Sequence, residues 1–289
     1  MKVTIIGAAG KMGRWFTNYF IEKGFEVVVY DINYEKLHKH YFEHKIIIAD
    51  DIKSASQHAD VILISIPINL TAKTVIDISK LVKENCIIIE IASFKEKIID
   101  YCKKNLEKKI NYLSLHPMFG PGAKNIIGAK MISVTVFDSK QEVLTTKKLF
   151  PDANIISVSA KDHDEYMAII LSLTQFINFA YASVLSLKNL ENIRRLSGTS
   201  FNLQLTIAEA ILHDDPEFLA TLQIENKYAI SQINRFVDES KILLELISKN
   251  NHKKLSIKLR KLQKAISKEN GYDKAYNKMY EIINKSIEK

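Results

Sequence analysis

The chain has 289 residues, of which 47% are hydrophobic, and a formal net charge of +8. This composition is typical of a globular protein with one large or two ordinary domains, and it excludes long disordered stretches. Residues 249–289 alone carry 12 Lys and Arg but 4 Asp and Glu, so they hold the whole charge excess and the rest of the chain is neutral overall. We interpret this excess as the solvated face of terminal helices and expect no nucleic-acid partner.

The apolar runs and the cysteines both favour a cytoplasmic protein. Runs such as residues 61–66 and 87–92 are much shorter than the roughly 20 residues that span a bilayer, so we expect no membrane association. The apolar N-terminus breaks at Gly7 and is predicted to be the first strand of a soluble domain, not a signal peptide. Cys86 and Cys102 lack CxxC or metal-ligand spacing, which predicts reduced thiols and no metal site.

The first half of the chain alternates β-branched runs with amphipathic segments. Residues 12–20 and 75–82 each place their large apolar side chains on one helical face. The strand-like runs are residues 3–6, 27–30, 46–48, 61–66, 87–91, 112–115 and 131–136. Strands that alternate with helices predict βαβ units and a parallel sheet covered by helices on both faces.

Beyond residue 162 the pattern changes to long helices. We predict helices at residues 163–187, 200–212 and 217–247, followed by two basic helices that are broken near Asn270-Gly271. The domain boundary is placed between residues 157 and 161. The prediction is therefore an α/β domain over residues 1–160, an all-α domain over 161–248 and a basic helical extension over 249–289.

A glycine-rich turn follows the first strand and opens the first helix, with the sequence Gly7-Ala8-Ala9-Gly10-Lys11-Met12-Gly13. Its glycines let the backbone turn tightly and approach a pyrophosphate at the helix N-terminus. The usual GxGxxG pattern has glycine where this chain has Ala8. Asp31 follows the second strand, where a carboxylate accepts hydrogen bonds from ribose hydroxyls and repels a 2′-phosphate. Together these features predict a Rossmann-type domain that binds NAD rather than NADP.

Further polar residues follow the later strands. Ser93 and Lys95 come after the fifth run and His116 after the sixth. Because strand C-termini share one edge in a doubly wound sheet, we expect these residues to line one crevice with the cofactor site. His116 opens a rigid His-Pro-Met-Phe-Gly-Pro-Gly loop, which favours a catalytic role. The predicted cofactor contacts are Gly7, Ala9, Gly10, Lys11, Met12, Gly13, Asp31, Ser65, Ile66 and Pro67.

Four runs make the sequence recognisable, and the most specific is Leu115-His116-Pro117-Met118-Phe119-Gly120-Pro121. The others are Ser65-Ile66-Pro67-Ile68, Ala92-Ser93-Phe94-Lys95 and Asp162-His163-Asp164. Their order and spacing resemble those of prephenate dehydrogenases, over about residues 3–246. The chain looks closest to a stand-alone dehydrogenase without a fused chorismate mutase. The resemblance implies that the helical domain binds substrate and pairs two subunits into a homodimer through residues 165–250.

The resemblance also implies an oxidative decarboxylation in tyrosine biosynthesis. NAD+ would take hydride from C4 of prephenate, and the ring carboxylate would leave as CO2. By similarity His116 would draw off the proton of the C4 hydroxyl, and Ser93 would orient that hydroxyl or the nicotinamide. Lys95 would place positive charge near the anionic substrate, unless it is an exposed loop lysine. His163 is expected either near the site or as a structural cap.

The helical domain departs from the family at its substrate-binding arginine. The family carries a Tyr-Arg-Leu-Glu-Leu type run, whereas this chain has Asn202 at the arginine position. A dicarboxylate thereby loses a bidentate guanidinium ligand. Thr174-Gln175 likewise replaces a His or Arg-His pair. The expected substrate contacts are therefore Ser93, His116, Lys124, His163, Gln175, Arg194, Arg195 and Asn202, with the two arginines and Lys124 as substitute cations.

Three alternatives stay open at this point. Arogenate differs from prephenate only in an amino instead of a keto group, and we find no residue that decides between them. Asn202 also fits a paralogue that acts on another cyclohexadienyl or 2-oxo acid. A catalytically silent nucleotide sensor would need neither Ser93, Lys95 nor His116, so these residues argue against it.

Overall fold

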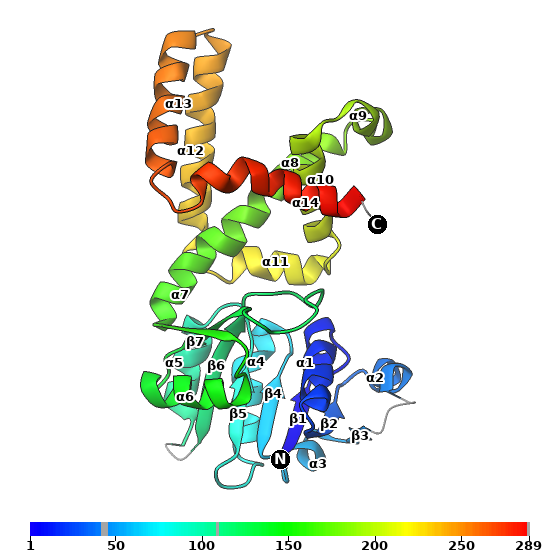
Figure 1. Ribbon diagram of the computed structural model, residues 1–289. Helices are drawn as coiled ribbons and strands as arrows, with labels where there is room; N and C mark the ends of the chain where they lie inside the picture. Colours follow the sequence, from blue (N-terminus) through cyan, green and yellow to red (C-terminus); the bar gives the residue numbers. More distant parts are fainter. Residues whose placement is uncertain (42–45, 108–109, 288–289) are drawn as a thin grey trace. The chain divides into compact units, whose positions relative to one another are not determined.

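The computed structural model describes residues 1–41, 46–107 and 110–287. The chain forms two compact units, Met1–Met167 and Ala168–Lys289 (Figure 1). Helix α7 (Ala160–Met167) packs on α5 (Glu96–Asn105), so the contacts place residues 161–167 with the first unit. The three-part division made from the sequence stays a prediction, and residues 288–289 of its basic extension lie outside the described residues.

The first unit is built on one eight-stranded sheet in the order β3-β2-β1-β4-β5-β6-β7-β8. Its strands are β1 (Lys2–Ile6), β2 (Glu26–Tyr30), β3 (Ile47–Ile48), β4 (Val61–Ile64), β5 (Ile87–Glu90), β6 (Asn111–Pro117), β7 (Lys130–Val134) and β8 (Asn154–Val158). The expected parallel pairing is wrong at β6 and β7, which are antiparallel, while the other neighbours are parallel. The cause is the connection: residues 118–129 form no helix, and a chain that returns without a crossover pairs antiparallel.

Strand β8 is absent from the sequence-based prediction. It lies at the edge of the sheet, next to β7. Its side chains are exposed or half-buried throughout. An edge strand with so little buried surface needs no strict alternation of apolar and polar residues, and this is why the pattern does not reveal it.

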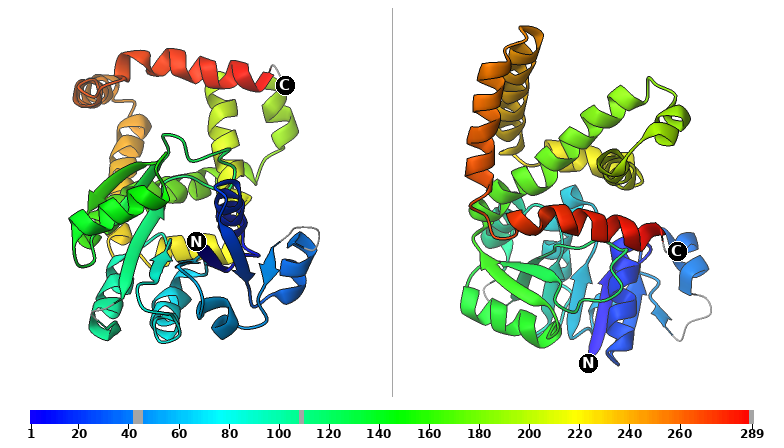
Figure 2. Two further views of the ribbon diagram at one scale, coloured as in Figure 1. Left: turned by 60° about the horizontal axis from the view of Figure 1, so that its bottom comes forward. Right: turned by 45° about the horizontal axis from the view of Figure 1, so that its top comes forward.

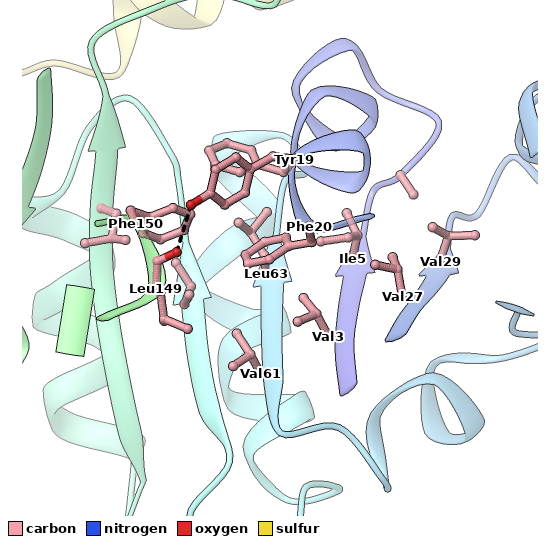
Figure 3. Packing of buried hydrophobic residues seen from close by; sticks show 14 of the residues in the cluster. Val3, Ile5, Tyr19, Phe20, Val27, Val29, Val61, Leu63, Leu149 and Phe150 are labelled. Carbon is pink, nitrogen blue, oxygen red and sulfur yellow. Dashed lines mark hydrogen bonds between the residues drawn. The ribbon is translucent and has the colours of Figure 1, made fainter. Parts of the chain in front are cut away.

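The helices of the first unit cover this sheet. They are α1 (Lys11–Glu22), α2 (Tyr34–Tyr41), α3 (Ile52–Ser56), α4 (Ile68–Ser79), α5, α6 (Ser139–Leu149) and α7. Helix α1 turns Phe20 onto side chains of β1 and β4 such as Ile5 and Leu63, and it turns Tyr19 toward Phe150 (Figure 3). The Tyr19 hydroxyl donates a hydrogen bond to the Leu149 carbonyl oxygen at 2.9 Å, which ties α1 to the end of α6. This apolar packing fixes the start of α1, and with it the glycine turn.

The second unit is helical throughout its described residues. Its elements are a π-helical turn η1 (Ala168–Leu173), α8 (Thr174–Leu185), α9 (Leu190–Leu196), α10 (Thr199–Leu212), α11 (Pro216–Ile224), α12 (Ala229–Ser248), α13 (His252–Ile266), a 3-10 turn η2 (Tyr272–Lys274) and α14 (Ala275–Ile287). Helices α12 and α13 lie side by side as a hairpin (Figure 2). The predicted fold, a Rossmann-type α/β domain followed by an all-α domain, is confirmed.

Two details of the helical prediction are wrong. Residues 217–247, expected as one helix, form α11 and α12, because the Asn226 side chain accepts a hydrogen bond from the Tyr228 backbone N–H at 2.9 Å. Such a local bond stops a helix. Helix α9 is absent from the sequence-based prediction; its N-cap is Asn189, whose side chain accepts a hydrogen bond from the Asn192 N–H at 3.0 Å.

One helical stretch, Ala160–Leu185, is long and apolar enough to cross a membrane by length and composition alone. Only 22% of its most apolar 18-residue window is buried within the chain. Exposed apolar surface of this kind also fits a helix that packs against another protein chain. The expected lack of membrane association stays a prediction.

Candidate active site

The turn after β1 passes very close to the end of β4. Gly7 has a φ of +85°, and a Cβ at this position would lie 2.2 Å from the Ser65 carbonyl oxygen. A Cβ on Gly13 would lie 2.1 Å from the Gly7 carbonyl oxygen. Both positions therefore require glycine. Gly7 supplies the tight turn that the usual pattern assigns to position 8, where Ala8 is wholly buried.

The N-terminus of α1 is suited to an anion. Its N-cap, Gly10, gives no side-chain cap, and no acidic residue stands in the first turn. First-turn N–H groups have no partner within the helix, and the helix dipole attracts negative charge there. The turn from Gly7 to Gly13, which includes Lys11 and Met12, thus fits the pyrophosphate of a dinucleotide.

Asp31 lies directly after β2 and is held against this turn. Its Oδ2 accepts a hydrogen bond from the Ala9 N–H at 2.9 Å, and its Oδ1 accepts one from the Asn33 N–H at 2.9 Å. Each carboxylate oxygen has a second lone pair, which can accept a ribose hydroxyl. Asp31 is therefore positioned both to shape the turn and to bind an adenosine ribose.

The segment after β4 adjoins the same turn. Ser65 donates its N–H to the Ile6 carbonyl oxygen at 2.8 Å, and Pro67 is the N-cap of α4. The carbonyl oxygen of Ser65 and the Cγ2 of Ile66 are among the atoms that a Cβ on Gly7 would meet. The structure thus brings Ser65, Ile66 and Pro67 together with the glycine turn.

Lys95 is fully buried, so the exposed-loop alternative is wrong. Its Nζ forms an ion pair with Glu90 at 2.7 Å and donates to the Leu115 carbonyl oxygen at 2.6 Å. Glu90 also accepts hydrogen bonds from the Ser114 hydroxyl and, at 2.7 Å, from the Ala92 N–H. Burial lowers the pKa of Lys95, against the opposing attraction of Glu90. The ammonium that was expected to serve the substrate is thus already matched by a buried carboxylate.

His116 lies near the end of β6 and is only 6% exposed. Its Nδ1 is 2.9 Å from Nε2 of His163, a residue of α7. His163 Nδ1 in turn lies 2.7 Å from Oδ1 of Asp164. His163 is thus in direct contact with the His116 ring and does not serve as a helix cap.

Burial favours the neutral form of both imidazoles. Burial lowers the pKa of His116 well below 6.5, and His163 and Lys95 lower it further. Burial also lowers the pKa of His163, although the hydrogen bond to Asp164 opposes that shift. A neutral imidazole is the form that accepts a proton, so His116 is equipped as a general base.

The remaining candidates of the first unit lie on loops. Ser93 is half-buried on the β5–α5 connection, and Lys124 is exposed on the β6–β7 connection. The indole N–H of Trp15 donates to the Ala123 carbonyl oxygen at 2.7 Å, which fixes that loop beside Lys124. Among the described residues, no cluster of three or more His, Cys, Asp and Glu side chains is arranged to hold a metal ion.

The other predicted substrate contacts belong to the second unit. Gln175 on α8 accepts a hydrogen bond from Gln223 at 3.0 Å, and Asn202 on α10 accepts one from the Ser197 hydroxyl at 2.5 Å. Arg194 on α9 pairs with Glu209, and Arg195 beside it is exposed. Their role toward a substrate stays a prediction.

Sequence reasoning missed Glu90 and Asp164. Glu90 ends the otherwise apolar strand Ile-Ile-Ile-Glu, and a carboxylate in a buried strand requires a partner. The same requirement indicates that a nearby cation, here Lys95, pairs with Glu90. Asp164 belongs to the recognised Asp162-His163-Asp164 run, but alternating charged and polar residues at the start of a helix are common at protein surfaces, so the pattern gave it no role.

The fold and the site define a class of protein. An open, mainly parallel sheet with a glycine turn after its first strand is the Rossmann-type dinucleotide-binding fold. Two family models match this chain, the prephenate dehydrogenase nucleotide-binding domain over residues 16–159 and the prephenate dehydrogenase dimerization domain over residues 159–262. The chain belongs to the prephenate dehydrogenase family.

Individual relatives agree with this membership. The chain is 23% identical over 268 residues to a protein of Methanocaldococcus jannaschii named "Probable arogenate/prephenate dehydrogenase", covering 90% of this chain and 60% of that one. It is 28% identical over 253 residues to the T-protein of Haemophilus influenzae, covering 84% and 62%. The chain thus spans about 60% of the length of the curated relatives it matches.

Among solved structures, prephenate dehydrogenase from Aquifex aeolicus, in complex with hydroxyphenyl propionate and NAD+, superposes with a TM-score of 0.74 at 21% identity. The match covers 93% of this chain and 98% of that one. At this identity the superposition establishes the fold.

Proposed function

We propose that the chain is an NAD-dependent dehydrogenase that converts prephenate to 4-hydroxyphenylpyruvate and CO2 in tyrosine biosynthesis. The observation that carries this proposal is His116, a buried neutral imidazole within the Leu-His-Pro-Met-Phe-Gly-Pro run of β6 and its following loop. The family, the glycine turn and Asp31 support it.

Bound NAD+ supplies the acceptor for the hydride that leaves C4 of the substrate. His116 takes the proton of the C4 hydroxyl as the carbonyl forms there. Loss of the ring carboxylate as CO2 then returns an electron pair to the ring, and the C4 oxygen regains a proton as a phenol. The balance is one hydride to the cofactor, one CO2 released and no net proton. Ser93, half-buried on the neighbouring loop, suits the orientation of that hydroxyl or of the nicotinamide.

Prephenate carries two carboxylates, and a buried carboxylate is costly without a cationic partner. Lys95 is matched by Glu90, so the available cations are Lys124, Arg194 and Arg195. The Arg194–Glu209 pair is about half exposed, and exposed pairs of this kind contribute only about 0–1 kcal/mol. A substrate carboxylate can therefore displace Glu209 at small cost.

Arogenate is the second candidate substrate. The name of the Methanocaldococcus relative includes both substrates, and prephenate and arogenate differ only in a keto or an amino group. Because Asn202 stands in place of the family's arginine, another cyclohexadienyl or 2-oxo acid is a third candidate substrate.

We also propose a cytoplasmic homodimer that pairs through the second unit. The support is the dimerization-domain match and the exposed apolar side chains of that unit, among them Val184, Leu187, Ile230 and Leu244.

The decisive experiment follows NADH absorbance with prephenate, with arogenate and with neither. We expect turnover of prephenate, and we expect His116→Asn to lower kcat by about 10²-fold or more with little change in substrate binding. Turnover of neither substrate would remove the tyrosine-pathway assignment. A near-normal kcat in His116→Asn would remove the imidazole from the reaction.

The substitute cation is tested separately with Arg194→Ala, Arg195→Ala and Asn202→Arg. If one arginine binds a carboxylate, its removal raises KM by the equivalent of about 1.5–3 kcal/mol, the contribution of a charged hydrogen bond. Asn202→Arg then helps little, because the carboxylate already has a partner. Normal substrate binding in both alanine variants, together with tighter binding in Asn202→Arg, would contradict the idea that Arg194 or Arg195 replaces the family's arginine.

A further inference from the structure

The two buried imidazoles and one carboxylate form a chain that ends on the backbone. His116 Nδ1 is 2.9 Å from His163 Nε2, and His163 Nδ1 is 2.7 Å from Asp164 Oδ1. The Asp164 carboxylate accepts the Lys95 N–H at 2.9 Å and the Glu96 N–H at 2.9 Å, at the N-terminus of α5. All of these groups belong to the first unit.

The direction of every hydrogen bond in this chain follows from Asp164. A carboxylate that accepts two backbone N–H groups at a helix N-terminus is held in its acceptor-only form. His163 must therefore carry its proton on Nδ1, which leaves Nε2 as an acceptor when the ring is neutral. His116 must then donate from Nδ1, so its unprotonated nitrogen is Nε2.

We propose that His163 and Asp164 are positioning residues that fix His116 in the tautomer with a basic Nε2. The role of that nitrogen toward the C4 hydroxyl rests on the proposed function, whereas the tautomer does not. When Nε2 takes up a proton, the Nδ1–H of the imidazolium still points at His163, and Asp164 behind it stabilises the positive charge. Neither His163 nor Asp164 needs to touch the substrate.

The surrounding charges are consistent with this arrangement. The charged groups that act on the two rings are Lys95 at the start of α5, Glu90 at the end of β5 and Asp164 on α7. Lys95 and Glu90 cancel one another as a buried ion pair. Asp164 places its carboxylate behind the imidazoles, and burial lowers the pKa of each ring below 6.5, which favours the neutral form of both.

The tautomer can be read without any substrate. Histidine labelled with ¹⁵N in the full chain gives separate ring signals for protonated and unprotonated nitrogens, and His116→Asn and His163→Gln assign the two rings. We expect at pH 7.5 a protonated Nδ1 and an unprotonated Nε2 for both His116 and His163. A protonated Nε2 on His116 would overturn the proposal, whether or not the enzyme turns over prephenate.

Asp164→Asn is the sharpest variant. Its amide oxygen can still accept the backbone N–H groups of α5, which turns the NH2 group toward His163 Nδ1. His163 must then accept there and donate from Nε2, so His116 becomes the tautomer with a protonated Nε2. We expect kcat to fall by about 10²-fold or more with NAD+ binding unchanged. The matched control is Asp162→Asn, which removes the same charge from the same helix, two residues away and exposed.

Replacement of His163 separates positioning from simple packing. Glutamine offers an oxygen to accept from His116 and an NH2 group to donate to Asp164, so His163→Gln should keep kcat within about tenfold. His163→Leu preserves apolar volume but no acceptor, and should lose about 10²-fold or more, with a shifted acid limb in the pH profile of kcat. Equal losses in the two variants, or Asp164→Asn with unchanged kcat and unchanged ¹⁵N signals, would overturn the proposal.

Discussion

Single residues of the first unit carry unusually large energetic consequences because several charges lie inside it. Lys95 and Glu90 are both fully buried, and His116 and His163 are nearly so. An ionisable group at such a depth is stable only with its partner in place. Three changes at this scale have distinct expected results.

The first concerns the buried ion pair. Lys95→Met should destabilise the first unit by about 3–5 kcal/mol, because it leaves the Glu90 carboxylate buried without its counter-charge. Adding Glu90→Gln should restore part of the loss, since glutamine still accepts from Ser114 or Ala92. The exposed pair Lys23–Asp152, at 2.6 Å, provides the control, and Lys23→Met should cost at most about 1 kcal/mol. Equal losses in urea unfolding for the two Lys→Met variants would contradict this account.

The second concerns cofactor choice. The charge of Asp31 repels a 2′-phosphate, so the unmodified enzyme should prefer NAD+ to NADP+ in kcat/KM. Asp31→Asn removes the charge while keeping an acceptor for the turn, whereas Asp31→Ser also shortens the side chain that holds the Ala9 N–H. Both variants should reduce the ratio of kcat/KM for NAD+ to kcat/KM for NADP+. Asp31→Asn should lose less stability than Asp31→Ser. Equal use of both cofactors by the unmodified enzyme is the result that would contradict this prediction.

The third concerns the pH dependence of stability. His116 and His163 have folded pKa values below 6.5, so under acidic conditions the unfolded chain takes up protons that the folded chain does not. Their contribution is fully present above pH 6.5 and is lost as the pH falls from 6.5 toward the folded values, by up to about 1.4 kcal/mol per pH unit for each group. Urea unfolding at pH 7.5, 6.5 and 5.5 measures the slope. The His116→Gln/His163→Gln variant should show a flatter slope between pH 6.5 and 5.5; an unchanged slope would refute the assignment.

At the scale of elements, the start of α1 depends on two close approaches of backbone to backbone. The glycine turn has to fit under the end of β4, and α1 has to begin against the Gly7 carbonyl group. The apolar face of α1 anchors the rest of the helix through Tyr19 and Phe20 (Figure 3). The helix is therefore unable to move away to make room for a larger residue.

Gly13→Ala should accordingly disrupt both stability and NAD+ binding. Its Cβ would lie 2.1 Å from a backbone oxygen, and neither group is the end of a flexible side chain. We expect the variant to lose measurable NAD+ binding in calorimetry and to unfold at lower urea concentration. Gly198→Ala, at the N-cap of α10 with no atom within 4 Å of the new Cβ, is the control and should change both quantities little. Normal NAD+ affinity in Gly13→Ala would disprove the close-contact argument.

At the scale of the whole molecule, the second unit exposes several large apolar side chains. Val184 is 63% exposed and Leu187 81% exposed. Large exposed apolar patches mark interaction sites. A second copy of this chain is the proposed partner.

Light scattering at micromolar concentration should therefore give the mass of a dimer. Val184→Glu with Leu187→Glu should shift it toward the 33.0 kDa monomer, because two carboxylates would be buried in the interface. Leu144→Glu, at a 55% exposed position on α6 of the first unit, is the matched control and should leave the mass unchanged. A monomer in the unmodified protein would contradict the proposed pairing.

The sequence by itself determined the fold class, and it predicted the cofactor end of the site. Both rest on short-range patterns: β-branched runs, the glycine turn between Gly7 and Gly13, and a carboxylate at Asp31 after the next strand. Such patterns fix local backbone conformation, and the C-terminal ends of parallel strands then have to share an edge. The same locality explains the misses, since the antiparallel β7, the edge strand β8 and the break at Asn226 depend on connections or single side-chain bonds that leave no periodic trace.

Only the tertiary structure decided which groups contact Lys95, His116 and His163. The sequence predicts Lys95 as a cation for the substrate. In the structure, the Glu90 carboxylate at the other end of the β5–α5 connection forms an ion pair with Lys95 and neutralises its charge. His116 and His163 are separated by 47 residues, and Asp164 meets α5 from 69 residues away. Contacts over such distances depend on how helix α7 packs against α5 and the end of β6. The residue types therefore pointed to His116, but the packing of a distant helix decided which groups its ring contacts and, in our proposal, which nitrogen carries the proton.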